Sequence, residues 1–256
     1  MSVSNNSLKA KFDKWKKDND QYGKQAFPRY MMLTFLSGLD STSDEFIFKG
    51  GNLLWHYIKT PRATVDLDLS TVTLASHKAV QNCFEKSFAI HEGIIFSIKK
   101  YASTDSEKEV GAKVVIGYET ETGQKNSFSV DVVYSLPTDV AIVKSTIGKG
   151  SHLSASIENI IADKMHASYK YRGGNTRMKD FDDLWRISKS DKKIRKSKIK
   201  KLFKEKEVDF YLDENWAEFM DIAWRKHSKV YSDLPNDIKT VFLDINDWLT
   251  RLKKPF

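Results

Sequence analysis

Two aspartates two residues apart, in the segment Asp66-Leu67-Asp68-Leu69, constrain the fold of this 256-residue chain more than any other feature. In a β-strand, residues i and i+2 point to the same face, so both carboxylates share one face while the leucines face a core. Carboxylates this close repel each other unless a cation lies between them. The segment therefore predicts a strand that binds a divalent cation. We expect Mg²⁺, with Mn²⁺ as the alternative, because carboxylate and phosphate oxygens are its usual ligands.

A glycine turn, Phe48-Lys49-Gly50-Gly51-Asn52, ends fourteen residues before Asp66. The apolar run that precedes the glycines predicts a short strand entering the turn, and Asn52 is predicted to cap the helix that follows. Backbone N–H groups at such a turn are suited to phosphate binding. We therefore expect Lys49, Gly50, Gly51 and Asn52 to contact a nucleotide.

A third carboxylate, Asp131, lies in the alternating segment Phe128-Ser129-Val130-Asp131-Val132-Val133. An acid within such a strand costs free energy unless its face is wet, paired or metal-bound. We expect this strand beside the Asp66 strand, so that Asp66, Asp68 and Asp131 form a catalytic metal site. The alternative is an ordinary exposed face of an edge strand.

The overall pattern predicts an α+β fold with two domains, at residues 1–145 and 146–256. In the first, a mixed sheet with flanking helices is expected, with helices at 25–39 and 76–89 and an antiparallel meander at 93–101, 112–119 and 127–134. The second is expected to be helical. Its predicted helices are 157–169, 179–188, 194–206, 214–227 and 237–252.

The net charge of +8 is concentrated in the second part of the chain. Residues 1–145 carry 18 basic and 17 acidic residues, whereas residues 146–256 carry 24 and 17. A polyanion such as RNA would therefore bind the helical part, chiefly the lysine-rich helix at 189–206. A basic face that only contacts solvent is the alternative.

Several cations in the helical part are candidates for binding a triphosphate. Lys164 lies on the apolar side of its predicted helix, where its ammonium reaches either a nucleotide or solvent. Arg177 and Lys179 stand at a helix start, where the dipole opposes them, so an anionic ligand is expected there. Asp180 is expected to orient Lys179 or Lys164, whereas the neighbouring Asp182 and Asp183 suit the dipole and require no function.

Other features exclude several classes of protein. Cys83 is the only cysteine, so an intrachain disulfide is excluded and a reducing compartment is indicated. No His or Cys pair has zinc-binding spacing, and no apolar run approaches the roughly 20 residues of a membrane span. Residues 1–6 lack the apolar segment of a secretory signal. We expect a cytoplasmic protein that does not interact with membranes.

Four ordered blocks resemble the AbiEii/AbiGii toxin family, of the DNA polymerase β-like nucleotidyltransferase superfamily. They are Lys49-Gly50-Gly51-Asn52, the segment from Arg62 to Leu69, the segment from Ile161 to Ala167, and the segment from Arg177 to Leu184. The resemblance implies an N-terminal nucleotidyltransferase domain, an NTP substrate and a toxin of a toxin–antitoxin or phage-defence system, with a cognate antitoxin. It also places Arg62, Lys164, Arg177, Lys179 and Asp180 among the nucleotide-binding residues, while the choice of Asp131 rests on the strand pattern.

The leading hypothesis is Mg²⁺-dependent transfer of a nucleoside monophosphate from an NTP to RNA, at a tRNA 3′ end, by a two-metal mechanism. Two alternatives remain open at this point. In the first, the active site is the same but the acceptor is a protein or a small molecule. In the second, the chain is a GTP- or NTP-binding regulatory module without turnover.

Overall fold

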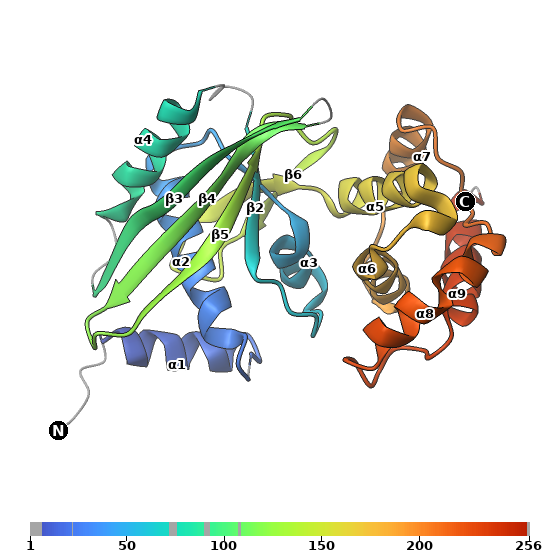
Figure 1. Cartoon of the computed structure of the whole chain (residues 1–256), viewed down its shortest axis with the longest axis horizontal. Coiled ribbons are helices and arrows are strands. Elements are labelled where there is room, and N and C mark those ends of the chain that lie inside the picture. The colour runs from blue at the N-terminus through green and yellow to red at the C-terminus, as the bar shows by residue number, and fades with distance from the viewer. Residues whose placement is uncertain (1–6, 22, 72–75, 90–92, 107–108, 255–256) are drawn as a thin grey trace. The chain divides into compact units, whose positions relative to one another are not determined.

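Seven strands form one mixed sheet in the part of the chain that the structure describes, residues 7–21, 23–71, 76–89, 93–106 and 109–254 (Figure 1). In this computed structural model the chain divides into a sheet unit, residues 1–53 and 63–155, and a helical unit, residues 54–62 and 156–256. The strands are β1 (Ile47–Lys49), β2 (Asp66–Ser70), β3 (Ile94–Ser106), β4 (Glu109–Thr120), β5 (Lys125–Val133), β6 (Val140–Lys144) and β7 (Ser151–Ala155).

The strand order β3-β4-β5-β2-β1-β7-β6 places the acidic strand β2 in the middle of the sheet. β2 pairs in parallel with β5, and β1 pairs in parallel with β7, whereas the other neighbours are antiparallel. The predicted meander is confirmed as β3, β4 and β5. The predicted approach of the Asp131 strand to the Asp66 strand is confirmed as well, by the β2–β5 pairing.

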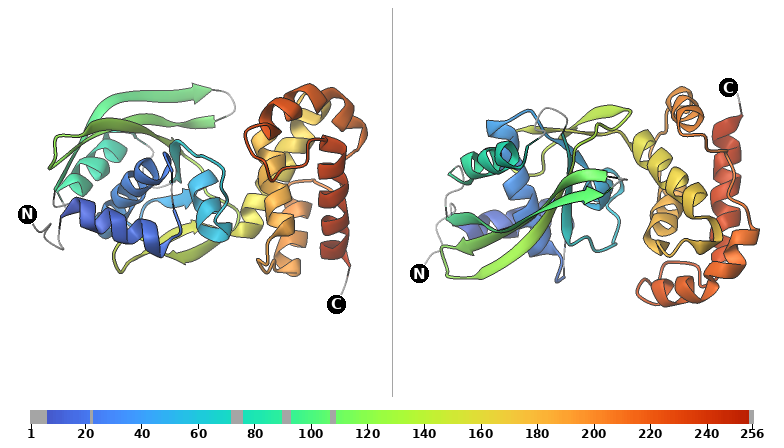
Figure 2. Two further views of the ribbon diagram at one scale, coloured as in Figure 1. Left: turned by 90° about the horizontal axis from the view of Figure 1, so that it is seen from below. Right: turned by 45° about the horizontal axis from the view of Figure 1, so that its top comes forward.

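Helices α2 (Ala26–Thr42) and α4 (His77–Phe88) lie on the same face of the sheet (Figures 1 and 2). An aromatic cluster joins these layers, because the ring of Phe35 on α2 contacts Phe84 on α4, Phe96 on β3 and Phe128 on β5. Helix α1 (Leu8–Asp18) packs its Phe12 ring against α2. This covered face is the core, and the acids lie on the opposite face.

Alternation along β2 and β5 separates the core from the site. Leu67 and Leu69 are fully buried, as is Val130 on β5, while Asp66, Asp68 and Asp131 are only partly buried. Successive side chains of a strand point to opposite faces of the sheet, which explains both observations. The sequence predicted this division correctly because it depends only on local strand geometry.

Two short strands differ from the sequence-based expectation, which places residues 146–155 in the helical domain and predicts no strand after residue 134. β6 and β7 pair with each other, and β7 continues the sheet beside β1. Each has five residues, and Ile142 on β6, the last strand of the sheet, is 75% exposed. Strands this short carry too little periodicity to be recognised.

The helical unit contains α5 (Ile157–Tyr171), α6 (Met178–Lys189), α7 (Lys196–Glu205), α8 (Asn215–Ser228) and α9 (Ile238–Lys253). These five helices confirm the predicted ones. The ring of Phe181 on α6 lies 5.0 Å from that of Phe242 on α9, within the core of this unit. Helix α3 (Gly50–Ile58) begins in the sheet unit and ends in the helical unit. Among the described residues, no helix has the length and apolar character to cross a membrane. The predicted α+β fold class is confirmed.

Candidate metal and nucleotide site

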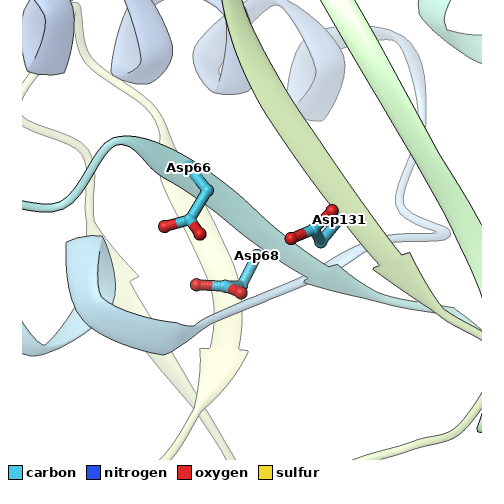
Figure 3. Close-up of side chains that lie close together, drawn as sticks. All are labelled: Asp66, Asp68 and Asp131. Carbon is cyan, nitrogen blue, oxygen red and sulfur yellow. The ribbon is translucent and has the colours of Figure 1, made fainter. Parts of the chain in front are cut away.

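Three carboxylates meet on the open face of the sheet. In the parallel pairing of β2 with β5, Asp68 is the direct partner of Asp131, and Asp66 stands two residues earlier on the same face. One oxygen of each carboxylate lies within 4.8 Å of the others, and Figure 3 shows the three side chains gathered beside the turn that leads into α3. We call Asp66, Asp68 and Asp131 the acidic trio.

The chemistry of the trio fits a divalent cation. Oxygens bound to one Mg²⁺ at about 2.1 Å lie up to about 4.2 Å apart, so small side-chain rotations bring the trio to that geometry. All three residues are partly exposed, which leaves room for water and substrate oxygens. Three adjacent negative charges need cationic compensation. In this structure Lys113 on β4, which sequence analysis did not identify, supplies one positive charge at 3.3 Å from Asp131 Oδ1.

Gly50 holds the glycine turn against the trio. Its φ of +75° lies in the left-handed region, which glycine adopts readily and other residues rarely do. A Cβ at this position would lie 1.7 Å from Asp68 Oδ2 and 2.7 Å from Asp68 Cβ. Lys49, at the end of β1, pairs in register with Asp68. Only glycine at position 50 therefore lets the turn approach the carboxylate so closely.

Asn52 does not cap a helix, and this prediction is wrong. α3 already begins at Gly50, and the Asn52 side chain is completely buried. Its amide donates a hydrogen bond to the Asp66 carbonyl oxygen at 2.7 Å and accepts one from Arg29 Nε at 3.2 Å. The side chain thus joins α2, α3 and β2 and positions the first acid of the trio. Arg29 was missed because nothing in its local sequence pattern distinguishes it from a surface cation.

The second group of predicted site residues forms an ion cluster within the helical unit. Lys164 Nζ lies 2.9 Å from Asp180 Oδ1 and 2.7 Å from Asp183 Oδ2. Arg62 contacts both oxygens of Asp183, at 2.7 and 3.1 Å, and Arg177 Nε lies 2.8 Å from Asp180 Oδ2. Three cations therefore share two carboxylates. Of the two lysines that Asp180 was expected to orient, Lys164 contacts it.

Burial and the neighbouring charges shift the pKa values of this cluster in opposite directions. Burial by itself would lower the pKa of the Lys164 ammonium, but the charges of Asp183 and Asp180 outweigh it and raise that pKa. Burial likewise would raise the pKa of the Asp180 carboxyl, yet Lys164 and Arg177 lower it overall. Both groups are therefore charged at neutral pH, and the cluster is held together by its own opposite charges.

Asp182 and Asp183, the remaining acids at the start of α6, also form ion pairs, so the helix dipole is not their only favourable interaction. Asp182 is fully buried and contacts Arg186 Nε at 2.5 Å and His227 Nε2 at 2.9 Å. Asp183 is the partner of Lys164 described above. The expectation that these two acids need no role beyond the dipole is wrong. Arg186 is on α6 itself, four residues after Asp182, whereas the other partners come from α5, α8 and residue 62, which sequence spacing does not indicate. Lys179 is exposed at the start of the helix.

Solved structures show the same fold. A candidate nucleotidyltransferase from Helicobacter pylori matches with a TM-score of 0.59 at 14% identity, covering 90% of this chain and 96% of that one. JHP933 from Helicobacter pylori matches with a TM-score of 0.53 at 15% identity, covering 90% and 92%. None of the curated proteins matches the sequence. This chain therefore has the fold of these two Helicobacter pylori proteins, with the acidic trio beside its glycine turn.

Residues 34–245 match the family described as nucleotidyl transferase AbiEii toxin, type IV toxin–antitoxin system, and the chain belongs to this family. The resemblance noted in the sequence is thereby confirmed. Fold and family together support a toxin-type enzyme that transfers nucleotidyl groups, with a nucleotide substrate and an antitoxin as partner.

Proposed function

We propose that this chain transfers a nucleoside monophosphate from an NTP to a hydroxyl of RNA, at a tRNA 3′ end, with two divalent cations. The observation that carries the proposal is the acidic trio, whose carboxylates converge from two parallel strands beside a glycine turn. Such convergence is costly without a cation and is suited to phosphoryl chemistry.

Mg²⁺ bound at the trio would polarise the phosphoryl oxygens and stabilise the developing charge. Asp66 and Asp68 would hold the cations, and Asp131 would complete the site. The acceptor hydroxyl oxygen forms a bond to the α-phosphorus while the bond to the bridging oxygen breaks, so that pyrophosphate leaves. Asp131 would take up the hydroxyl proton, since a carboxylate is an adequate base for a hydroxyl that a cation has acidified.

Phosphate binding is assigned to the backbone at the β1–α3 turn. The N–H groups of Gly50 and Gly51 begin α3, and the N-terminus of a helix attracts anions. Lys49 adds a positive charge at the same turn. The Asn52 amide is engaged by Asp66 and Arg29, so its role is to position β2 rather than to contact phosphate.

Triphosphate binding by the cations of the helical unit remains part of the proposal. Arg177 and Lys179 are exposed at the start of α6. Lys164 and Arg62 are engaged by Asp183, so we assign them to holding the cluster together. If Arg177 and Lys179 bind the triphosphate, replacing both with alanine raises the Kd for a non-hydrolysable NTP and leaves Mn²⁺ binding at the trio unchanged.

RNA binding is assigned to the basic side of α7 and the segment before it. Ile199, Leu202 and Phe203 are buried, so the opposite side of this helix faces solvent. The exposed lysines there are Lys192, Lys193, Lys200, Lys201 and Lys204. Contacts of this kind with the phosphate backbone weaken steeply as the salt concentration rises.

The test combines purified protein, Mg²⁺, total tRNA and each α-labelled NTP in turn. Asp68→Asn is the inactive variant, and Asp44→Asn, an exposed aspartate of the same unit, is the matched control. We expect one nucleotide to label tRNA with the wild type and with the control but not with Asp68→Asn. If only protein or small molecules carry label, the acceptor is one of these and not tRNA. If nothing carries label although the NTP binds tightly, the chain is better explained as a regulatory module.

A further inference from the structure

Lys113 forms an ion pair with Asp131 of the acidic trio. It stands on β4, directly opposite Asp131 in the antiparallel pairing with β5. Its Nζ lies 3.3 Å from Asp131 Oδ1, and its side chain is 52% exposed against 34% for Asp131. The pair therefore lies at the border between the metal site and solvent.

A lysine ammonium and a divalent cation compete for the same carboxylate oxygens. The ammonium is a compact point charge on a flexible stem, so it can turn into water when a stronger cation arrives. Lys113 offsets one of the negative charges of the trio. Lys113 thus reduces the electrostatic attraction of the trio for further cations.

We propose that Lys113 is a resident counter-ion of Asp131 in the acidic trio, which competes with divalent metal for this carboxylate and weakens metal binding by the nucleotide-free protein. This inference rests on the proposed metal site. Its consequence is that full occupancy of the trio requires Lys113 to leave Asp131. The neutral variant binds metal more tightly than the wild type, a gain that loss of structure would not produce.

The strands β4 and β5 provide a matched control. Lys125 on β5 pairs with Glu119 on β4 at 3.0 Å, so it is another exposed cross-strand ion pair on the same two strands. Mn²⁺ binding, measured by the loss of the free-ion signal in electron paramagnetic resonance, is compared for wild type, Lys113→Met, Lys113→Arg and Lys125→Met. Circular dichroism melting checks that all four fold.

We expect Lys113→Met to lower the Kd for Mn²⁺ about tenfold, from the loss of one unit charge at this range near the surface. Lys113→Arg and Lys125→Met should bind as the wild type does. In an Asp131→Asn background the effect of Lys113→Met should largely disappear, because its partner is gone.

An unchanged or weakened affinity in Lys113→Met, or an equal gain in Lys125→Met, would overturn the role of Lys113 while leaving the metal site intact. Absence of Mn²⁺ binding by the wild type, with or without NTP, would instead overturn the metal site of the proposed function, and the role of Lys113 with it. The two failures are therefore distinguishable in one titration series.

Discussion

Replacing Gly50 with alanine tests whether the glycine turn and the acidic trio form one unit. The φ of +75° costs an alanine roughly 1–2 kcal/mol. The added Cβ would also meet Asp68, at 1.7 Å from Oδ2 and 2.7 Å from Cβ. Rotating the carboxylate relieves the first contact but not the second, so the turn and β2 must separate. Overpacking of this kind costs about 1–3 kcal/mol more. We expect Gly50→Ala to lower the free energy of unfolding by about 3 kcal/mol.

Gly148→Ala is the matched control, because Gly148 has a φ of +69° but no atom within 4 Å of an added Cβ. Its expected cost is the backbone part alone, about 1–2 kcal/mol. Urea unfolding followed by circular dichroism measures both variants, and Mn²⁺ titration in the folded range measures the site. Gly50→Ala should bind Mn²⁺ weakly and Gly148→Ala normally. The reasoning would be refuted if the two variants had equal free energies of unfolding and Gly50→Ala bound Mn²⁺ with wild-type affinity.

Three further predictions concern the residues around the two clusters. Asn52→Ala removes the hydrogen bonds of this buried amide with the Asp66 carbonyl and Arg29 Nε, so unfolding measurements should show a loss of about 2 kcal/mol; a loss below about 0.5 kcal/mol would contradict its positioning role. Lys164→Met leaves Asp180 and Asp183 buried with fewer cations and should cost about 3 kcal/mol, with Lys179→Met as the near-neutral control. The lowered pKa of Asp180 stabilises the fold above the unfolded-state pKa of about 3.9, and this contribution is lost as pH falls through the lower folded-state pKa. The stability difference between wild type and Asp180→Asn should therefore shrink as the pH falls below about 4, and a constant difference would be inconsistent with this assignment.

Local periodicity explains why much of the fold was predictable. Alternation predicted that Leu67 and Leu69 face the core and that Asp66 and Asp68 do not, because strand geometry alone sets the two faces. The five helices of the helical unit were predictable for the same reason, since their apolar stripes repeat over three or four turns. β6 and β7 were not, because strands of five residues carry no comparable pattern.

The sequence by itself determined which residues form strands and helices, that Asp66 and Asp68 share a face, and which family the chain resembles. Only the tertiary structure decided which distant groups meet: Asp131 opposite Asp68, Lys113 beside Asp131, Gly50 against Asp68. It also decided that Asn52 points inward to the Asp66 carbonyl. The physical reason is that side-chain direction within an element follows from local backbone geometry, whereas contacts between elements depend on strand pairing and packing, which distant parts of the chain determine together.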